Sequence, residues 1–140
     1  MKNKRDSGTA LFLMEMIAVV CFFILCASVC ILVFVRANNL SRLARDTNQA
    51  SLAAESVAEI WKAEAEDGLA ARFHMSRDGD AGVIYWDSQW NVTEEEILTG
   101  YAAIVNLETK EHTEEAQIQI LRSEDKTELF LLTVKRIPDR

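Results

Sequence analysis

The chain has 140 residues, of which 49% are hydrophobic, and a formal net charge of −7. Residues 37–140 carry 11 Lys and Arg against 20 Asp and Glu, a net charge of −9. Such an acidic surface repels phosphate backbones, which argues against nucleic-acid binding. All three cysteines precede residue 31, so residues 37–140 form no disulfide framework among themselves.

A long apolar stretch covers residues 10–35 and is interrupted only by Glu15 and one serine. From Met16 to Val35, twenty consecutive residues carry no charge. A helix of about 20 apolar residues spans a hydrocarbon core about 30 Å thick. The alternatives are a buried core helix, for which the chain has no second segment long enough to enclose it, and a signal peptide, whose apolar region is shorter. We therefore expect a single transmembrane helix over residues 11–36.

Glu15 lies near the start of this apolar stretch, and no cationic residue lies one helical turn away from it within the stretch. A carboxylate in the middle of a membrane-spanning helix costs about 2.5–3.5 kcal/mol on insertion scales, and less near an end. The Glu15 side chain can reach toward the lipid headgroups. Alternatively, if the chain were cut just before Leu11, Glu15 could pair with the new α-amino group of a neighbouring chain. Both interpretations are compatible with the sequence.

Three basic residues precede the small residues Ser-Gly-Thr-Ala at positions 7–10, and Leu-Phe-Leu-Met-Glu-Met-Ile then opens the apolar stretch. This segment resembles the N-terminal signature of type IV pilins and of the pseudopilins of type II secretion. The resemblance covers about residues 4–60. It implies that a prepilin peptidase cuts between Ala10 and Leu11 and methylates the new N-terminus, which makes Glu15 the fifth residue. The family usually has Gly before the cut, where this chain has Ala, and Phe or Met after it, where this chain has Leu.

The resemblance also implies a function. We expect a non-enzymatic, membrane-anchored subunit, a minor component of a type IV pilus or of a type II secretion-like filament. It would assemble through its N-terminal helix with other pilin-like subunits and with assembly platform proteins, with Glu15 at the contact. The N-terminus would be cytoplasmic, the helix in the lipid of the cell membrane, and the C-terminal domain external. The alternative is a bitopic membrane protein whose external domain binds a partner without any filament.

The helix is expected to continue beyond the membrane over residues 37–67 and to stop at Gly68. Apolar and small residues recur at spacings of three and four from Leu40 to Trp61, which is the spacing of one helix face. A coiled-coil dimer could use the same face, but three heptads with Thr and Ala in the seam are weak. We therefore expect this face to pack on the chain's own sheet through Leu43, Ala50, Ala54, Val57 and Trp61.

Residues 68–140 are expected to form a small antiparallel β domain. The sequence predicts a strand and a strand stub over residues 83–92, followed by strands at 101–107, 116–121 and 128–134 joined by short polar connections. The strand at 128–134 is apolar on both faces and is expected to be covered on both. Together with the leader at 1–10, these segments predict an α+β fold in which the second half of a long helix packs on the sheet, the layout of pilins.

The sequence offers little chemistry for catalysis, so we expect no enzyme, no cofactor and no metal site. His74 and His112 are isolated in expected loops. Asp78 and Asp80 lie in an expected loop at 76–82 and could approach a calcium ion, but no Glu follows at the offset of an EF-hand. The three consecutive glutamates at 94–96 are expected to be a solvated linker.

Overall fold

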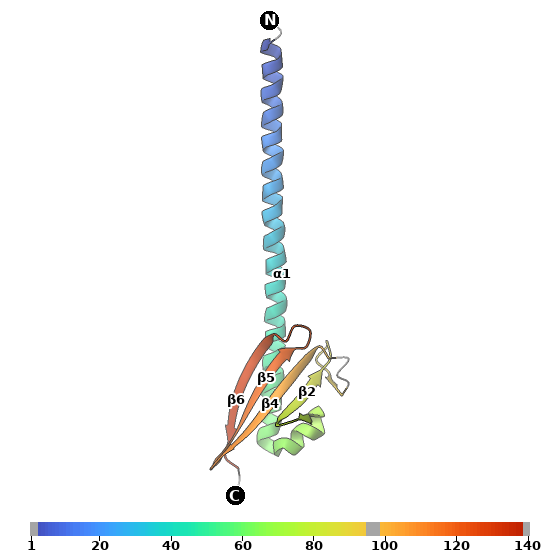
Figure 1. Ribbon diagram of the computed structural model, residues 1–140, viewed down its shortest axis with the longest axis vertical. Helices are drawn as coiled ribbons and strands as arrows, with labels where there is room; N and C mark the ends of the chain where they lie inside the picture. Colours follow the sequence, from blue (N-terminus) through green and yellow to red (C-terminus); the bar gives the residue numbers. More distant parts are fainter. Residues whose placement is uncertain (1–2, 95–98, 139–140) are drawn as a thin grey trace. The chain divides into compact units, whose positions relative to one another are not determined.

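The structure, a computed structural model, describes residues 3–94 and 99–138. The chain forms two compact units, Met1–Leu43 and Ala44–Arg140. Helix α1 runs from Asn3 to Phe73 and is followed by six strands (Figure 1).

In the N-terminal unit, α1 exposes every side chain described from residue 6 to residue 43. Among the described residues, this is the one helix long and apolar enough to cross a bilayer, with a mean hydropathy of 3.1 over its most apolar window and none of that window buried. The Ser28 hydroxyl donates a hydrogen bond to the Ile24 carbonyl at 2.8 Å, so it is satisfied within the helix. The unit is therefore compatible with a single membrane crossing.

In the C-terminal unit, α1 turns sharply at Ala65, whose φ of 57° and ψ of −150° are not helical. Gly68, expected to stop the helix, is instead buried within the second segment, residues 66–73. A Cβ atom on Gly68 would lie 2.4 Å from Cβ of Glu64 and 3.1 Å from Cγ2 of Ile60. The glycine thus permits the close approach of the two segments, and the helix continues past the predicted end at Asp67.

The strands form one antiparallel sheet in the order β1-β2-β4-β5-β6, with β3 paired to β2. The expected strand positions and hairpins are confirmed. Residues 76–82, expected to be a loop, instead contain the hairpin of β1 and β2, which turns at Gly79 with a φ of 66°. The strands are Ser76–Asp78 (β1), Ala81–Trp86 (β2), Val92–Thr93 (β3), Tyr101–Lys110 (β4), Thr113–Arg122 (β5) and Glu128–Arg136 (β6).

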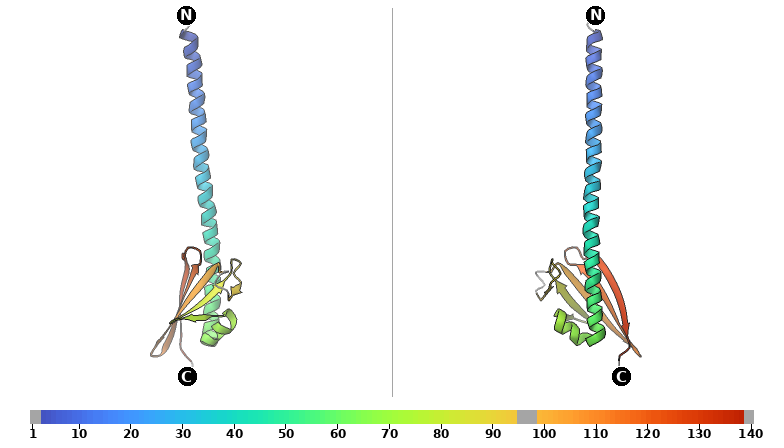
Figure 2. Two further views of the ribbon diagram at one scale, coloured as in Figure 1. Left: turned by 45° about the vertical axis from the view of Figure 1, so that its right-hand side comes forward. Right: turned by 180° about the vertical axis from the view of Figure 1, so that it is seen from behind.

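The core lies between one face of this sheet and the part of α1 that belongs to the C-terminal unit (Figure 2). Small side chains on the helix allow the backbone to approach the sheet closely, while Ile and Val on the strands fill the space between them. Leu43 is outside this core, with 43% of its surface exposed. The buried helix residues are Ala50, Ala54, Val57, Ala58, Trp61 and Leu69, and those of the sheet include Ile84, Trp86, Ala103, Val105, Ala116, Ile118 and Ile120.

Strand β6 is covered on one face only, so the expectation that both faces are covered is wrong. Its outward-facing Leu131 is 45% exposed. The helix side carries Phe130, Leu132 and Val134, which pack against the core but are only half-buried. The reason is its position: β6 is an edge strand of a two-layer domain.

Replacing Ala65 with glycine should stabilise the C-terminal unit by about 1 kcal/mol, because this φ/ψ region is populated almost only by glycine and costs other residues about 1–3 kcal/mol. Ala63→Gly is the matched control, since Ala63 is exposed and helical; there glycine should cost about 1 kcal/mol. All three tryptophans lie in this unit, so denaturant unfolding of the full chain in detergent can be followed by tryptophan fluorescence. Equal destabilisation by the two variants would contradict strain at Ala65.

Candidate functional site

The predicted processing and assembly residues lie together on the first turns of α1. Ala10, Leu11 and Glu15 are exposed, Leu11 by 70%. Among the described residues, the Glu15 carboxylate has no hydrogen bond or ion pair. No described side chain of its own chain therefore compensates the charge in the apolar segment, which lipid headgroups, water or another chain could do.

In the C-terminal unit, Asp46 of α1 binds the sheet through a clasp of three side chains. Its Oδ2 lies 2.7 Å from Nη2 of Arg122, and its Oδ1 accepts a hydrogen bond of 3.1 Å from the Tyr101 hydroxyl. The Asp46 and Arg122 side chains are only 19% and 24% exposed, so solvent screens this pair incompletely. The hydrogen bond to Asp46 raises the pKa of Arg122, and burial followed by Asp46 raises the pKa of Tyr101.

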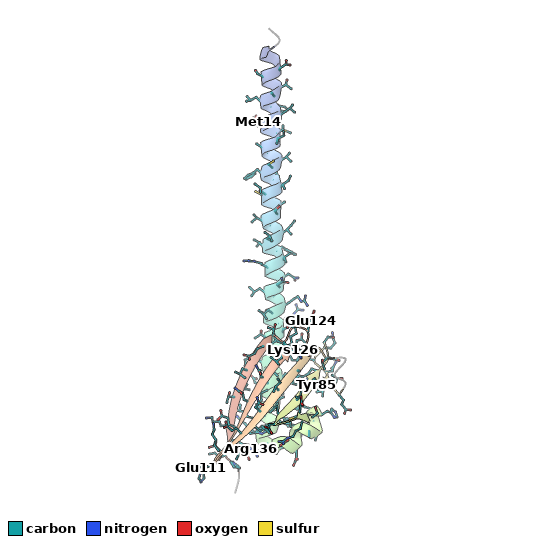
Figure 3. The ribbon with its side chains drawn as sticks, viewed as in Figure 1. Met14, Tyr85, Glu111, Glu124, Lys126 and Arg136 are labelled. Atoms are coloured by element: carbon teal, nitrogen blue, oxygen red, sulfur yellow. The ribbon has the colours of Figure 1, made fainter. Side chains whose placement is uncertain are left out.

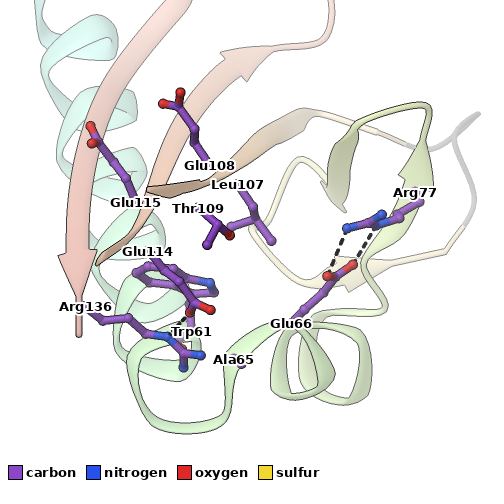
Figure 4. A pocket seen from close by; sticks show the side chains of 10 residues that line it. All are labelled: Trp61, Ala65, Glu66, Arg77, Leu107, Glu108, Thr109, Glu114, Glu115 and Arg136. Carbon is purple, nitrogen blue, oxygen red and sulfur yellow. Dashed lines mark hydrogen bonds and ion pairs between the residues drawn. The ribbon is translucent and has the colours of Figure 1, made fainter. Parts of the chain in front are cut away.

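At the opposite end of the sheet, Arg136 joins β6 to the helix. Its Nε lies 2.5 Å from Oε2 of Glu114, its Nη1 donates to the Trp61 carbonyl at 3.1 Å, and its guanidinium lies 5.3 Å from the centre of the Trp61 ring. Beside it is a hollow of about 270 Å³ (Figure 4). Across the hollow, Arg77 forms two hydrogen bonds of 2.6 and 3.0 Å with Glu66. The charges are thus paired within the hollow, which favours a structural role.

Arg122 and Arg136 were not predicted from the sequence to be site residues. The alternation of side chains along their strands nevertheless indicates that both face inward. Arg122 continues the inward-facing series of Ile118 and Ile120. Arg136 likewise continues the series of Leu132 and Val134. Because side chains alternate along a strand, a charged residue at an inward position must find a partner on the layer that covers it.

The outer face of the sheet carries a second, larger hollow of about 410 Å³, lined by both apolar and polar side chains. Its rim includes Asp78 and Lys126, and Figure 3 shows Tyr85, Glu124 and Lys126 toward one end of the domain, with Glu111 at the other. Thr99 and Ser123 line it as well, and its apolar lining residues are Val83, Tyr85, Ala102, Ile104 and Leu121.

No group of three or more His, Cys, Asp or Glu side chains placed to hold a metal ion occurs within residues 3–94 and 99–138. His74 instead lies with its Nδ1 2.9 Å from Oε1 of Glu94 at the surface. Asp78 ends β1 and Asp80 follows the turn at Gly79. Of the expected acidic linker, Glu95 and Glu96 lie outside the described residues.

Comparisons of the chain with protein-family models, with curated proteins and with solved structures find no match. The class of the protein therefore follows from its own residues. It is an α+β protein with a long apolar N-terminal helix, compatible with one membrane crossing, and a C-terminal antiparallel sheet.

Removing the clasp should weaken the C-terminal unit. Asp46→Asn should lower its free energy of unfolding by about 1.5–3 kcal/mol, the range for hydrogen bonds to charged groups. Arg72→Gln is the control, because its ion pair with Glu64 is 58% and 44% exposed and should contribute about 1 kcal/mol or less. Denaturant unfolding of both variants, followed by tryptophan fluorescence, measures the difference. Equal effects would mean that the clasp contributes no more than a surface pair.

The raised pKa of Tyr101 predicts a loss of stability at alkaline pH. The tyrosine ionises at about pH 10 in the unfolded chain and at higher pH in the folded one, so its contribution is complete below pH 10 and is lost as the pH rises through the folded value. Between pH 8 and 11 the unfolding midpoint of the native chain should fall more steeply than that of Tyr101→Phe. Parallel curves would contradict this assignment.

Proposed function

We propose that the chain is a non-enzymatic, membrane-anchored subunit of a filament of the type IV pilus or type II secretion kind, in which it is a minor component. The observation that supports this best is Glu15, a single carboxylate in an apolar helix and the fifth residue after the Ala10–Leu11 bond at which the resemblance places cleavage. The assembly surface of such a subunit would be the helix itself.

The exposed apolar side chains of the N-terminal part of α1 support the proposal, because other molecules would have to cover them. Large apolar side chains from Leu11 to Val35 are 45–77% exposed, so the chain itself buries none of this segment. Exposure to water would be costly, at about 25 cal/mol for each Å² of apolar surface. Lipid would cover the segment in the membrane, and the helices of neighbouring subunits would cover it in a filament.

In such a bundle, Glu15 would fix the axial position of each helix relative to its neighbours. Removal of residues 1–10 would place an α-amino group on Leu11, and this group of one subunit could pair with Glu15 of the next. In an apolar surrounding, an unpaired carboxylate is strongly unfavourable, so only an arrangement that brings the two groups together would be stable. In the C-terminal unit a helix is covered on one side by an antiparallel sheet, which supports the proposal because the pilin resemblance implies a helix packed on a small sheet.

The second candidate is a bitopic membrane protein whose external domain binds a partner without forming a filament. The hollow on the outer sheet face favours it, because its lining residues all follow the expected assembly helix in the sequence and binding there needs no processing. In this alternative the leader is retained or its loss has no consequence, and Glu15 reaches the headgroups.

N-terminal sequencing of membrane-extracted protein from cells containing a prepilin peptidase tests the proposal. The chain should begin at Leu11. Ala10→Gly, the residue usual in the family, should be processed at least as completely, whereas a bulky Ala10→Leu should retain Met1. An intact Met1 start in the unaltered chain would contradict the filament proposal.

Co-purification with other pilin-like subunits separates the two candidates. Glu15→Ala should lose the complex, whereas Met14→Ala, next to it on the same exposed helix, should retain it. If processed Glu15→Ala protein retained its complex unchanged, the bitopic alternative would be favoured.

A further inference from the structure

Helix α1 runs without interruption through the bond at which we expect cleavage. It begins at Asn3, and Ala10 and Leu11 both lie within it. In an α-helix each N–H group bonds to the carbonyl four residues before it, so this peptide bond lies inside a hydrogen-bonded turn. A peptidase needs the bond in an extended segment, whose backbone groups are free to pair with the enzyme. The helix must therefore unwind as far as this bond before it can be cut.

Unwinding costs least when it proceeds from the start of the helix. The first four N–H groups of a helix have no partner within it, so the chain opens turn by turn from that end. Opening residues 3–10 breaks the bonds that their carbonyls accept from the N–H groups of residues 7–14. The side chains of residues 6–10 are exposed. The cost of opening these turns therefore depends mainly on how strongly their residues favour a helix.

The residues just before the bond are poor helix formers. Residues 6–9 read Asp-Ser-Gly-Thr, four types that all rank below alanine in helix propensity, with glycine the lowest of them. The apolar stretch that follows the bond has a different cost. Opening it in lipid would leave backbone groups without any partner, which is strongly unfavourable. Helix α1 is thus weak before the Ala10–Leu11 bond and strong after it.

Gly8 has no steric reason to be a glycine. Apart from its chain neighbours and the adjacent backbone of its own helix, a Cβ atom on Gly8 would have no described atom within 4 Å, and its φ is not positive. Gly68 differs, because a Cβ atom there would lie 2.4 Å from Cβ of Glu64. Within a helix, glycine lowers the helical population about fivefold relative to alanine. The effect that the structure leaves for Gly8 is therefore to weaken the helix beside the bond.

We propose that Gly8 is a positioning residue for processing, which lets the first turns of α1 unwind so that a peptidase can take the Ala10–Leu11 bond in extended form. The inference rests on the proposed function, because it concerns the same bond, and it adds the residue that makes the bond accessible. Gly8 acts through the backbone conformation of its neighbours and not through a contact with the enzyme.

Gly8→Ala tests the conformational step without any peptidase. With the full chain in detergent micelles, hydrogen–deuterium exchange of the backbone amides of residues 8–12 should be about fivefold slower in the variant, because alanine favours the closed helix by that factor. The open space around Gly8 means that the added methyl group causes no clash. Equal exchange of these amides in the native chain and the variant would overturn the inference.

The same variant tests processing. With a limiting amount of prepilin peptidase, the half-time of cleavage should rise about fivefold, and N-terminal sequencing should still give Leu11 as the first residue. Ala37→Gly is the control, because Ala37 is exposed and helical but lies beyond the apolar stretch; it should be cut at the native rate. If the native chain is cut and Gly8→Ala is cut equally fast, the inference fails while the filament proposal stands. A native chain that is left intact would contradict both.

Moving the glycine separates unwinding from recognition of residue 8. Ser7→Gly combined with Gly8→Ala keeps one glycine in the same turn, so exchange and cleavage should both return to within about twofold of the native chain. A double variant that is cut as slowly as Gly8→Ala would mean that the peptidase reads position 8 itself, which would overturn the inference. A product that begins at Thr9 would make Gly8 the residue before the cut, with the same consequence.

Discussion

The structure depends on the packing of the small-residue face of α1 on one side of the sheet. Ala50 and Ala54 are fully buried, and their small side chains let the helix backbone lie close to the strands. The same helix has an N-terminal part in which every described side chain from residue 6 to residue 43 is exposed and mostly apolar. α1 is thus suited to two different surroundings. Its apolar residues are mostly large in the exposed N-terminal part and mostly small where the helix packs on the sheet.

The sheet is held to the helix at both ends by inward-facing arginines. Arg122 reaches Asp46 near the start of the unit, and Arg136 reaches Trp61 and Glu114 near the turn at Ala65. A domain of this size buries little apolar surface, so directional polar contacts at the ends of the core determine the position of the helix along the strands. The two arginines therefore set the register of the two layers, while the alanines set their separation.

Most of the fold follows from local patterns in the sequence. The spacing of Ala50, Ala54, Val57 and Trp61 identifies the helix face, and the alternation around Ile118 identifies a strand with one buried side. The turn at Ala65 could not be predicted, because nothing local distinguishes this alanine from its helical neighbours; the turn is stabilised by packing after it, at Gly68 and Leu69. The Asp46 clasp was also missed, since its members are 55 and 76 residues apart.

The error at β6 shows why composition alone does not determine burial. Its residues are apolar on both faces, which is typical of a central strand, yet among the described residues no strand other than β5 pairs with it, so it lies at the edge. A central-strand sequence at an edge conflicts with the usual protection of edges. The apolar pattern of β6 therefore identifies it as a strand, whereas its place at the edge is set by the order in which the described strands pair.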